Sequence, residues 1–434
     1  MKSPFFPAIE TQPVEEIRRY QDLKLQELLR YLDSYSPFYK NLFDSQRIDP
    51  TKISGINDLI HIPPTTKEDL QRQNKDFLCV GKEKIVDYIT TSGTQGDPVT
   101  FALTDKDLNR LAYNEAISFT CADAHPGEIY QLMTTIDRRF MAGMAYFLGI
   151  RELGASVIRV GNGIPELQWD TIHRISPDAI VVVPSFILKI IEYAEKHGIE
   201  YQSCSVKKAI CIGEPLRNQD LTFNALARKI LDKWPLKLYP TYASTEMATS
   251  FTECSAGTGG HHHPELIIVE FLDENDQPVS EGEPGEVTVT PLGIEGMPLL
   301  RFKTGDICSH YTDPCSCGRT TLRIGPVIGR KNQMIKYKGT TIYPPSLYDI
   351  LDGIDYVYNY VVEVSINEIG TDHILIHAGS KESISHMESD IRDHFRAKLR
   401  VAPTIIFHPY EEIHQMQFPD NSRKSIKFID NRVI

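Results

Sequence analysis

The strongest candidate for phosphate chemistry is the segment 90–98, TTSGTQGDP, which combines hydroxyl side chains with glycines directly after a strand-like run. Glycine permits tight turns and close backbone approach, and hydroxyl and N–H groups can surround phosphate oxygens. The segment lacks the Gly-Lys-Ser/Thr sequence of a Walker loop, which disfavours a P-loop kinase. It therefore predicts a phosphate-binding loop of another type, with an ordinary surface turn as the alternative.

Two later segments end in carboxylates. Residues 239–246, YPTYASTE, place Glu246 among hydroxyls just beyond a strand, where a carboxylate suits a magnesium–nucleotide site. The alternative is a capping box that opens a helix. Residues 301–306, RFKTGD, predict a strand that ends in a turn at Asp306. That carboxylate suits the two hydroxyls of a ribose, or it only stabilises its own turn.

Two basic segments lie nearer the C-terminus. Residues 329–336, GRKNQMIK, and residues 422–427, SRKSIK, carry lysines and arginines in polar surroundings. Taken singly, a lysine in such a segment is usually a solvated surface charge. These segments gain a functional interpretation only from their order after the earlier motifs.

Cysteine and histidine side chains offer a separate set of metal ligands. Cys315 and Cys317 form a Cys-x-Cys turn, and Cys254 and the histidine run 261–263 lie earlier in the chain. Three thiolates and one imidazole make a closed tetrahedral zinc site, which is structural because it leaves no open position. The spacing does not settle which histidine binds. His261 is favoured, ahead of the second and then the third histidine of the run, and unmetallated loop cysteines are the alternative.

The elements that must position these segments alternate between strand and helix over residues 85–240. Residues 180–183, IVVV, form a continuous β-branched run that is typical of a strand buried on both faces. Strand–helix alternation predicts an open, largely parallel α/β sheet. The expected helices of this region span residues 104–121, 140–152, 185–197 and 218–232.

The pattern changes after residue 265, where short strands are joined by Gly, Pro, Asp and Asn turns. Residues 331–434 form an α+β segment with a charged helix over 381–400. We therefore expect an α/β protein whose large N-terminal domain, residues 1–329, has mostly parallel α/β sheets plus a β subdomain. A small α+β C-terminal domain covers residues 330–434.

The composition is that of a globular protein and not of a fibrous, disordered or disulfide-stapled one. The 434 residues are 41% hydrophobic and 24% charged, and the net charge is −12. The acidic balance argues against a nucleic-acid or anionic-membrane partner, and no apolar run approaches the ~18 residues that span a bilayer. The N-terminal residues lack the apolar core of a signal peptide, so we expect a cytoplasmic protein with reduced cysteines.

The ordered combination of these motifs resembles the adenylate-forming superfamily of acyl-CoA synthetases and luciferases. A Ser/Thr/Gly loop is followed by Tyr-x-x-Thr-Glu, by Thr-Gly-Asp, by Gly-Arg and by a near-terminal lysine. The segments LLRYL, IPPTTKEDL, VPSF and GEPL look like the phenylacetate–CoA ligase branch, and the resemblance covers about residues 15–434. It implies a small C-terminal domain that rotates on a hinge between two half-reactions.

The resemblance implies roles for individual residues in binding ATP. The phosphates would be held by Ser92, Gly93, Thr94 and Gly96. Glu214 and Pro215 would lie by the adenine, with Tyr242 close to its ring, and Gly213, Ala243 and Ser244 would also bind the cofactor.

The remaining nucleotide contacts follow from the later motifs of the family. Thr245 would contact phosphate, and Glu246 would hold Mg²⁺. Asp306 would bind the ribose hydroxyls with help from Arg330, and Asn332 stands at the hinge position, where the family commonly has Asp. Some members of the branch also carry a zinc site at the cysteine segments.

Lys424 would be the lysine that supports adenylation. The family motif usually reads Ser/Thr-x-Gly-Lys, and here Arg423 replaces the glycine, so Lys427 stays open as the alternative. Gln95 is a further departure, because the phosphate loop of the family usually has Thr at this position.

The implied function is the ATP-dependent ligation of a carboxylic acid to CoA. Acid and MgATP would give an acyl-adenylate and pyrophosphate, and CoA would then displace AMP. The acid, phenylacetate or a related aryl or acyl acid, is expected near residues 137–146, which are otherwise a helix start packed on the sheet. An adenylate-forming enzyme with a non-CoA acceptor and a non-catalytic zinc-organised binding protein are the alternatives. The oligomeric state is left open, a homodimer included.

Overall fold

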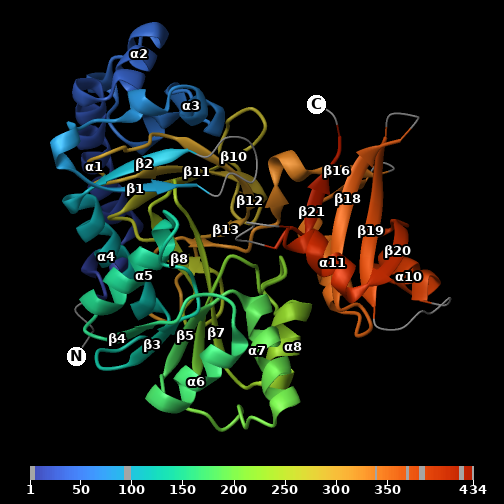
Figure 1. The fold of residues 1–434 in the computed structure, drawn as a ribbon. Coiled ribbons are helices and arrows are strands. Elements are labelled where there is room, and N and C mark those ends of the chain that lie inside the picture. The colour runs from blue at the N-terminus through green and yellow to red at the C-terminus, as the bar shows by residue number, and fades with distance from the viewer. Residues whose placement is uncertain are drawn as a thin grey trace. The chain divides into compact units, whose positions relative to one another are not determined.

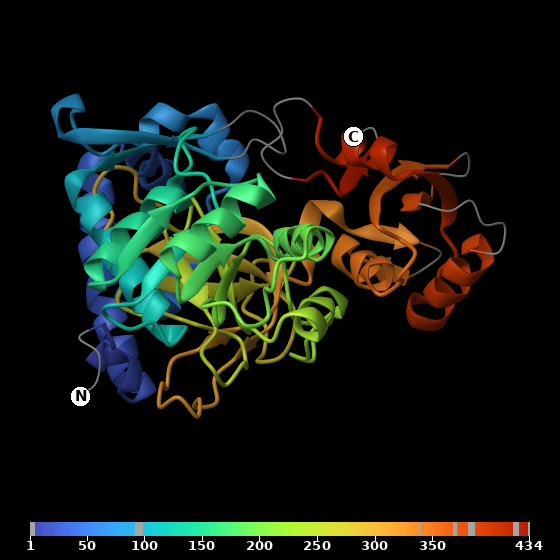
Figure 2. The ribbon, with the colours of Figure 1, turned by 60° about the horizontal axis from the view of Figure 1, so that its bottom comes forward.

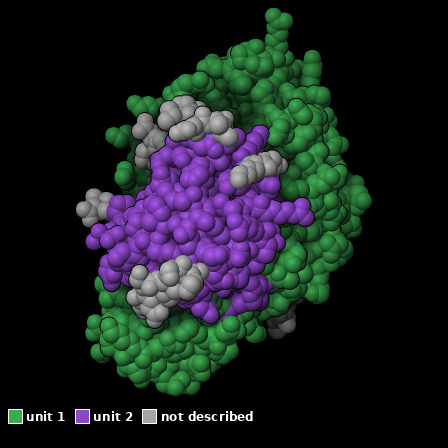
Figure 3. Space-filling view, turned by 90° about the vertical axis from the view of Figure 1, so that its right-hand side faces the viewer, with its two compact units in different colours: residues 1–222, 229–304, 308–326 green, residues 223–228, 305–307, 327–434 purple. Residues whose placement is uncertain are grey.

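The computed structural model describes residues 5–91, 99–337, 340–367, 371–380, 387–419 and 425–432. The chain forms two compact units, which Figure 3 shows in different colours. The first comprises residues 1–222, 229–304 and 308–326, and the second comprises residues 223–228, 305–307 and 327–434. The second unit thus takes in two short segments from earlier in the chain, and the division into domains 1–329 and 330–434 stays a prediction.

The N-terminal part of the first unit is helical (Figure 1, blue). Helix α1 (Val14–Tyr35) buries one isoleucine and four leucines at the spacing of a single helix face. The Ser36 side chain accepts a hydrogen bond from the N–H of Tyr39 and caps α2 (Pro37–Gln46). The other short helices are α3 (Lys67–Arg72) and the 3-10 turns η1 (Ala8–Thr11), η2 (Pro50–Lys52), η3 (Ile56–His61), η4 (Asn74–Phe77) and η5 (Lys82–Lys84).

A six-stranded sheet in the first unit has the strand order β4-β3-β5-β6-β7-β8 (Figure 1). All neighbouring strands are parallel except β7 and β8. The strands are β3 (Ile129–Leu132), β4 (Ser156–Arg159), β5 (Ala179–Val182), β6 (Lys208–Ile212), β7 (Lys237–Ser244) and β8 (Thr249–Thr252). Every residue of β5 is buried, as its apolar run predicts. The predicted, largely parallel α/β sheet is confirmed.

Helices alternate with these strands along the chain, as Figure 2 shows from a second direction. They are α4 (Asp105–Cys121), α5 (Met141–Glu152), α6 (Pro165–Ile175), α7 (Pro184–His197) and α8 (Ala225–Lys233). The prediction that the last of them begins at residue 218 is wrong. Asp220 accepts hydrogen bonds from the N–H and the hydroxyl of Thr222, and this local turn competes with a helix.

Antiparallel strands complete the first unit. The hairpin of β1 (Ile85–Thr90) and β2 (Thr100–Thr104) precedes α4, and β10 (Ile267–Leu272) pairs with β11 (Gly285–Pro291). A small sheet contains β13 (His310–Tyr311), β14 (Arg323–Ile324) and β9 (Gly260–His261). The prediction that the strand of residues 301–306 ends in a turn at Asp306 is wrong. Strand β12 (Phe302–Cys308) continues to Cys308, with a positive φ of 76° at Gly305.

The second unit contains a four-stranded sheet in the order β20-β19-β18-β21 (Figure 1). The strands are β18 (Asn359–Ile366), β19 (Asp372–Ser380), β20 (Thr404–Pro409) and β21 (Phe428–Asp430). Helices α9 (Pro344–Asp352) and α10 (Met387–Leu399) share an apolar core with one face of this sheet, and α11 (Tyr410–Gln417) contacts β18, β19 and β20. The remaining elements are β15 (Gly329–Arg330), η6 (Lys331–Gln333), β16 (Ile335–Tyr337) and β17 (Thr340–Ile342).

Among the described residues, every helix is too short or too polar to span a lipid bilayer.

Candidate active site and metal centre

The carboxyl ends of the neighbouring strands β6 and β7 carry the predicted adenine site. Ile212, the last residue of β6, pairs with Thr241 of β7. Residues 213–215 therefore leave the sheet beside residues 242–244, which form the last part of β7. Ligands of open α/β sheets bind at this edge, outside the carboxyl ends of the strands.

The segment 213–215 is fixed to the first turn of α7. Gly213 has a positive φ of 79°, which favours glycine. Oε2 of Glu214 accepts a hydrogen bond from the N–H of Ser185 at 2.8 Å. A carboxylate is favourable there because it meets the unpaired N–H groups and the positive dipole end of the helix.

Thr245 and Glu246 lie in the tight turn between β7 and the antiparallel β8. The N–H of Ala248 donates to the carbonyl of Thr245 at 3.3 Å, and φ of Ala248 is +46°. The capping-box alternative for this segment is wrong, because the chain turns back as a strand instead of entering a helix. Glu246 is half-buried in this turn.

Thr245 and Glu246 also line a small pocket in the first unit. The other lining residues are apolar and include Ile89, Phe101, Met141, Ile294 and Met297. Met141 opens α5 and belongs to the segment that was predicted to lie near the acid. The pocket thus places a carboxylate beside an apolar surface, the two features that a metal-bound nucleotide and an apolar acid each need.

The residues that were predicted to bind phosphate, Ser92, Gly93, Thr94 and Gly96, lie outside the described residues. The chain on either side of them is paired: the N–H of Thr91 donates to the carbonyl of Val99 at 3.0 Å, and the N–H of Val99 donates to Oγ1 of Thr91 at 3.1 Å. The N–H of Thr90 donates to the carbonyl of Arg139 at 3.1 Å. The predicted phosphate loop therefore starts next to the segment that was predicted to bind the acid.

The predicted ribose-binding residues lie in the second unit and contact each other. Asp306 of β12 pairs with Arg330 of β15, and Nε of Arg330 donates to Oδ1 of Asp306 at 3.2 Å. Asp306 is buried and Arg330 is exposed. Asn332 follows in η6, and its carbonyl accepts a hydrogen bond from the Arg432 guanidinium at 3.4 Å.

Lys424 lies outside the described residues, whereas its alternative, Lys427, is placed. The Lys427 ammonium lies 5.8 Å from the ring centroid of Tyr348 and 5.4 Å from that of Tyr360. A cation over aromatic rings is held by their negative faces. Lys427 thus contacts two aromatic rings within the second unit.

The four predicted metal ligands come together in the first unit. The ligand atoms of Cys254, His261, Cys315 and Cys317 all lie within 4.8 Å of one another. The Sγ atoms of Cys254 and Cys315 are 3.6 Å apart, and Nε2 of His261 is 3.4 Å from the Sγ atoms of Cys254 and Cys317. These distances match the edges of a tetrahedral site with metal–sulfur bonds of about 2.3 Å and metal–nitrogen bonds of about 2.0–2.1 Å.

The three consecutive histidines have different partners. Only His261 points its Nε2 at the thiols, while Nε2 of His262 lies 2.6 Å from the carbonyl of Ile267. Nδ1 of His263 lies 2.5 Å from Oε1 of Glu10. The geometry therefore agrees with the preference for His261, while the other two histidines have other partners.

The pKa shifts in the cluster favour the metal-binding forms of Cys317 and His261 and disfavour the thiolate of Cys254. The hydrogen bond from Cys254 and the proximity of His261 lower the pKa of Cys317, which favours its thiolate. The same hydrogen bond, together with burial, raises the pKa of Cys254. Burial lowers the pKa of His261 and so favours the neutral imidazole. A thiolate and a neutral imidazole are the forms that bind metals.

Glu10 is a buried residue of this region that the sequence analysis did not identify. Its Oε1 contacts Nδ1 of His263, and its Oε2 accepts a hydrogen bond from Nε of Arg319 at 2.6 Å. Burial opposes ionisation of Glu10, but His263 and Arg319 outweigh it and lower its pKa. Arg319 also lies 3.6 Å from the Sγ of Cys317. The only signal in the sequence is that Glu10 follows the apolar run FFPAI.

Replacing Glu10 with glutamine is expected to lower the free energy of unfolding by about 3–5 kcal/mol, because the buried Arg319 and His263 then lose the carboxylate that they share. Urea denaturation of the full chain measures this change. Glu15→Gln, at an exposed position of α1, is the matched control and should change the free energy by less than about 0.5 kcal/mol. Equal stability of both variants would contradict the role of Glu10.

The comparisons with known proteins agree with this arrangement. The family model described as AMP-binding enzyme matches residues 42–294. A phenylacetate–coenzyme A ligase of Thermus thermophilus is 30% identical over 351 residues, which are 80% of this chain and 77% of that relative. A phenylacetate–coenzyme A ligase of Escherichia coli K12 is 27% identical over 369 residues, 82% of this chain and 81% of that relative.

A solved structure shares the fold over nearly the whole chain. The crystal structure of 2-hydroxyisobutyryl-CoA ligase in the postadenylation state, in complex with R3-HIB-AMP, has a TM-score of 0.86 and 20% sequence identity. The match covers 98% of this chain and 92% of that chain. Together with the sequence relatives, it shows that the chain belongs to the AMP-binding enzyme family, in the branch that contains the phenylacetate–coenzyme A ligases.

Proposed function

We propose that the protein is an ATP-dependent acid–coenzyme A ligase. The substrate carboxylate attacks the α-phosphorus of ATP, pyrophosphate leaves, and the CoA thiol then displaces AMP from the acyl-adenylate to give the thioester. The observation that carries this proposal is the pocket that Glu246 lines together with apolar residues, within the part of the chain that matches the AMP-binding family. The acid is phenylacetate or a related aryl or acyl acid, as the names of the relatives suggest.

The residues near the sheet edge would bind the nucleotide and lower the barrier to adenylation. Glu246 would hold Mg²⁺, which neutralises phosphate charge when it is bound. Thr245 would contact phosphate, and residues 213–215 with 242–244 would surround the adenine. Because Glu214 is hydrogen-bonded to the start of α7, this loop is fixed before the ligand binds, which reduces the entropy lost on binding.

The second unit would supply the ribose contacts and the lysine. Asp306 would bind the ribose hydroxyls with help from Arg330, whose hydrogen bond orients the Asp306 carboxylate. Lys424 would neutralise charge as the acid carboxylate approaches the phosphate, because two anions repel each other. The contacts of Lys427 with two tyrosine rings favour Lys424 for this role. Rotation of residues 330–434 near Asn332 would withdraw the lysine before CoA reacts.

The experiment that tests the function is an assay of AMP and pyrophosphate release with a panel of aryl and acyl acids. We expect both products to depend on the acid, with the largest rate for an apolar aryl acid, and thioester to form only when CoA is present. Acid-dependent pyrophosphate exchange without any CoA-dependent AMP release would indicate a different acceptor. The absence of both activities across the panel would contradict the proposal.

We also propose that Cys254, His261, Cys315 and Cys317 hold a structural Zn²⁺. The donor set and its spacing support a closed site that pins distant loop segments of the first unit. Thiolate ligation requires reduced cysteines, in keeping with the predicted cytoplasmic location.

Elemental analysis of the purified full chain is expected to give about one zinc per chain. Cys315→Ser should lower this content at least tenfold, because a closed site loses one of its four ligands. Cys204→Ser is the matched control, since Cys204 lies outside the cluster, and it should keep its zinc. A wild-type chain without bound metal would show that the cluster is only a group of loop cysteines.

A further inference from the structure

The second unit contains a histidine–carboxylate cluster that the nucleotide chemistry does not use. His377 of β19 and His408 of β20 face each other, with Nδ1 of His377 3.0 Å from Nε2 of His408. Nε2 of His377 lies 3.1 Å from Oε2 of Glu363 in β18, and Nδ1 of His408 lies 3.2 Å from Oε2 of Glu412 in α11. Four elements, of which β20 and α11 are consecutive in the chain, thus meet at one pair of imidazoles.

The strand register explains why these side chains meet. His377 pairs with Val361 on one side and with Ile406 on the other, so Glu363 and His408 each lie two residues from a direct partner of His377. Side chains two residues apart on a strand share a face of the sheet. This face lies opposite the one that packs on the apolar core, to which Val362 and Val364 contribute.

If both rings are neutral, their hydrogen bonds to the carboxylates leave neither of the two facing nitrogens with a proton to donate to the other. A carboxylate accepts, so Nε2 of His377 and Nδ1 of His408 must each carry a proton. In two neutral imidazoles, the other nitrogens then both present lone pairs, at a separation of only 3.0 Å. Such an arrangement needs a positive species between the rings, either a metal ion or one extra shared proton.

We propose that His377 and His408 are the protein ligands of a divalent transition-metal site on the second unit. Two nitrogen ligands of one metal ion, bonded at about 2.0–2.1 Å, lie about 2.9–3.4 Å apart for right-angled to tetrahedral geometry, and the observed 3.0 Å fits this range. Glu363 and Glu412 accept hydrogen bonds from the ring nitrogens that do not bind the metal, as carboxylates commonly do for metal-bound histidines. Water completes the coordination.

Charge and exposure support a metal ion over a shared proton. The two carboxylates bring two negative charges, which a divalent ion balances and a single proton does not. The amide of Asn431 donates to Oε1 of Glu363 at 2.7 Å and so fixes this carboxylate from its other side. The side chains of His377 and His408 are 12% and 24% exposed, and Glu412 is 61% exposed, so an ion can enter from solvent.

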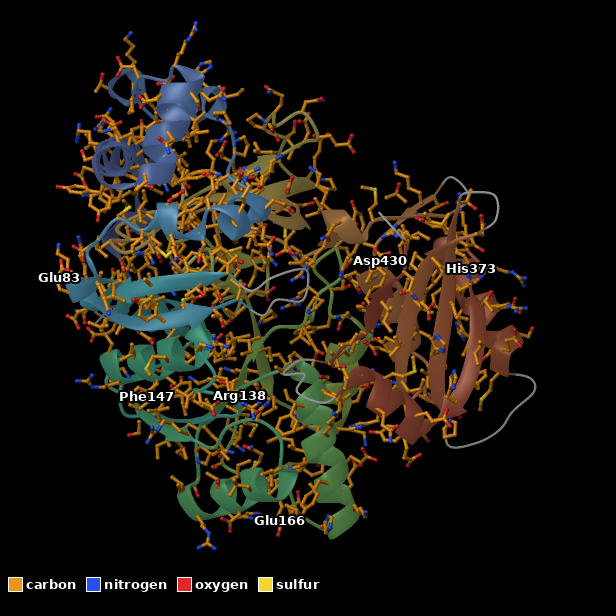
Figure 4. The ribbon with its side chains drawn as sticks, turned by 45° about the horizontal axis from the view of Figure 1, so that its top comes forward. Glu83, Arg138, Phe147, Glu166, His373 and Asp430 are labelled. Atoms are coloured by element: carbon orange, nitrogen blue, oxygen red, sulfur yellow. The ribbon has the colours of Figure 1, made fainter. Side chains whose placement is uncertain are left out.

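Ni²⁺ binding to the full-length protein tests this site, because Ni²⁺ favours imidazole ligands. Isothermal titration is expected to show one more Ni²⁺ per chain in the wild type than in His377→Asn or His408→Asn. His373→Asn is the matched control. His373 (labelled in Figure 4) lies four residues before His377 on β19 and so on the same face, but it bonds Thr404, and this variant should bind as the wild type does. Zinc release is measured in parallel, so that exchange at the cysteine cluster is counted separately.

A variant that keeps both histidines tests whether weaker Ni²⁺ binding has a cause other than a folding defect. Glu412→Gln, at an exposed position, should weaken Ni²⁺ binding about 10–100-fold, the usual effect of losing a partner behind a metal ligand. Thermal unfolding without added metal checks that each variant is folded. If folded His377→Asn and His408→Asn both bind Ni²⁺ with the wild-type stoichiometry and affinity, the two rings only share a proton and the metal site is refuted.

Discussion

Replacing Lys424 with alanine is expected to slow acid-dependent pyrophosphate release by about 10²–10³-fold, the usual effect of removing one charge-stabilising group from a transition state. The physical reason is that the acid carboxylate must approach a phosphate that already carries negative charge, and a nearby ammonium offsets the repulsion. Single-turnover pyrophosphate release at saturating acid and MgATP measures the chemical step directly.

Measuring the second half-reaction distinguishes a role of Lys424 in adenylation from a folding defect of the variant. Thioester formation from a supplied acyl-adenylate should keep its rate in the Lys424→Ala variant, because no charge has to be neutralised at the α-phosphate before the thiol attacks. Lys427→Ala is the matched comparison in the same segment, and its lost contacts with Tyr348 and Tyr360 should affect stability more than adenylation. Wild-type adenylation in Lys424→Ala would show that the assignment is wrong, and a larger loss in Lys427→Ala would move it to that residue.

Replacing Glu246 with glutamine is expected to lower the rate of adenylation by about 10²-fold and to raise the Mg²⁺ concentration that gives half of the maximal rate. Glutamine keeps the size of the side chain in the turn between β7 and β8 but removes the charge that attracts the cation. The rate is measured as a function of Mg²⁺ at fixed ATP.

Glu274→Gln is a suitable control for the change in net charge, since Glu274 is an exposed residue of a turn in the same unit. It should leave both the rate and the Mg²⁺ dependence within a factor of two. An unchanged Mg²⁺ dependence in Glu246→Gln would mean that the cation is held elsewhere, and the pocket beside Glu246 would then serve the acid alone.

Much of the architecture could be predicted from the sequence because it depends on local patterns. The alternation of β-branched runs with amphipathic segments predicted the parallel sheet, and β5 with its four buried residues shows why: a strand covered on both faces has no polar position. The failures are also local. The helix predicted over residues 218–232 begins only at Ala225, because the Asp220 side chain stabilises a competing turn.

The site could be predicted in its residue types and order, but less in its local geometry. The segment of Glu246 fits a helix cap as well as a strand turn by sequence, and only the pairing of β7 with β8 decides between them. Asp306 looked like a turn residue, whereas the register of β12 with β15 places it opposite Arg330. Strand register depends on residues far apart in the chain, so no short window of sequence contains it.

The sequence by itself determined the order of the nucleotide motifs, the donor types of the metal cluster and the fold class, since each is written in neighbouring residues or in their spacing. The tertiary structure alone decided which of three identical histidines faces the thiols, that Glu10 is buried against Arg319, and that His377 and His408 face each other. The physical reason is common to all three. Side-chain direction is set by strand pairing and packing, and these bring together residues that have no local relation in the chain.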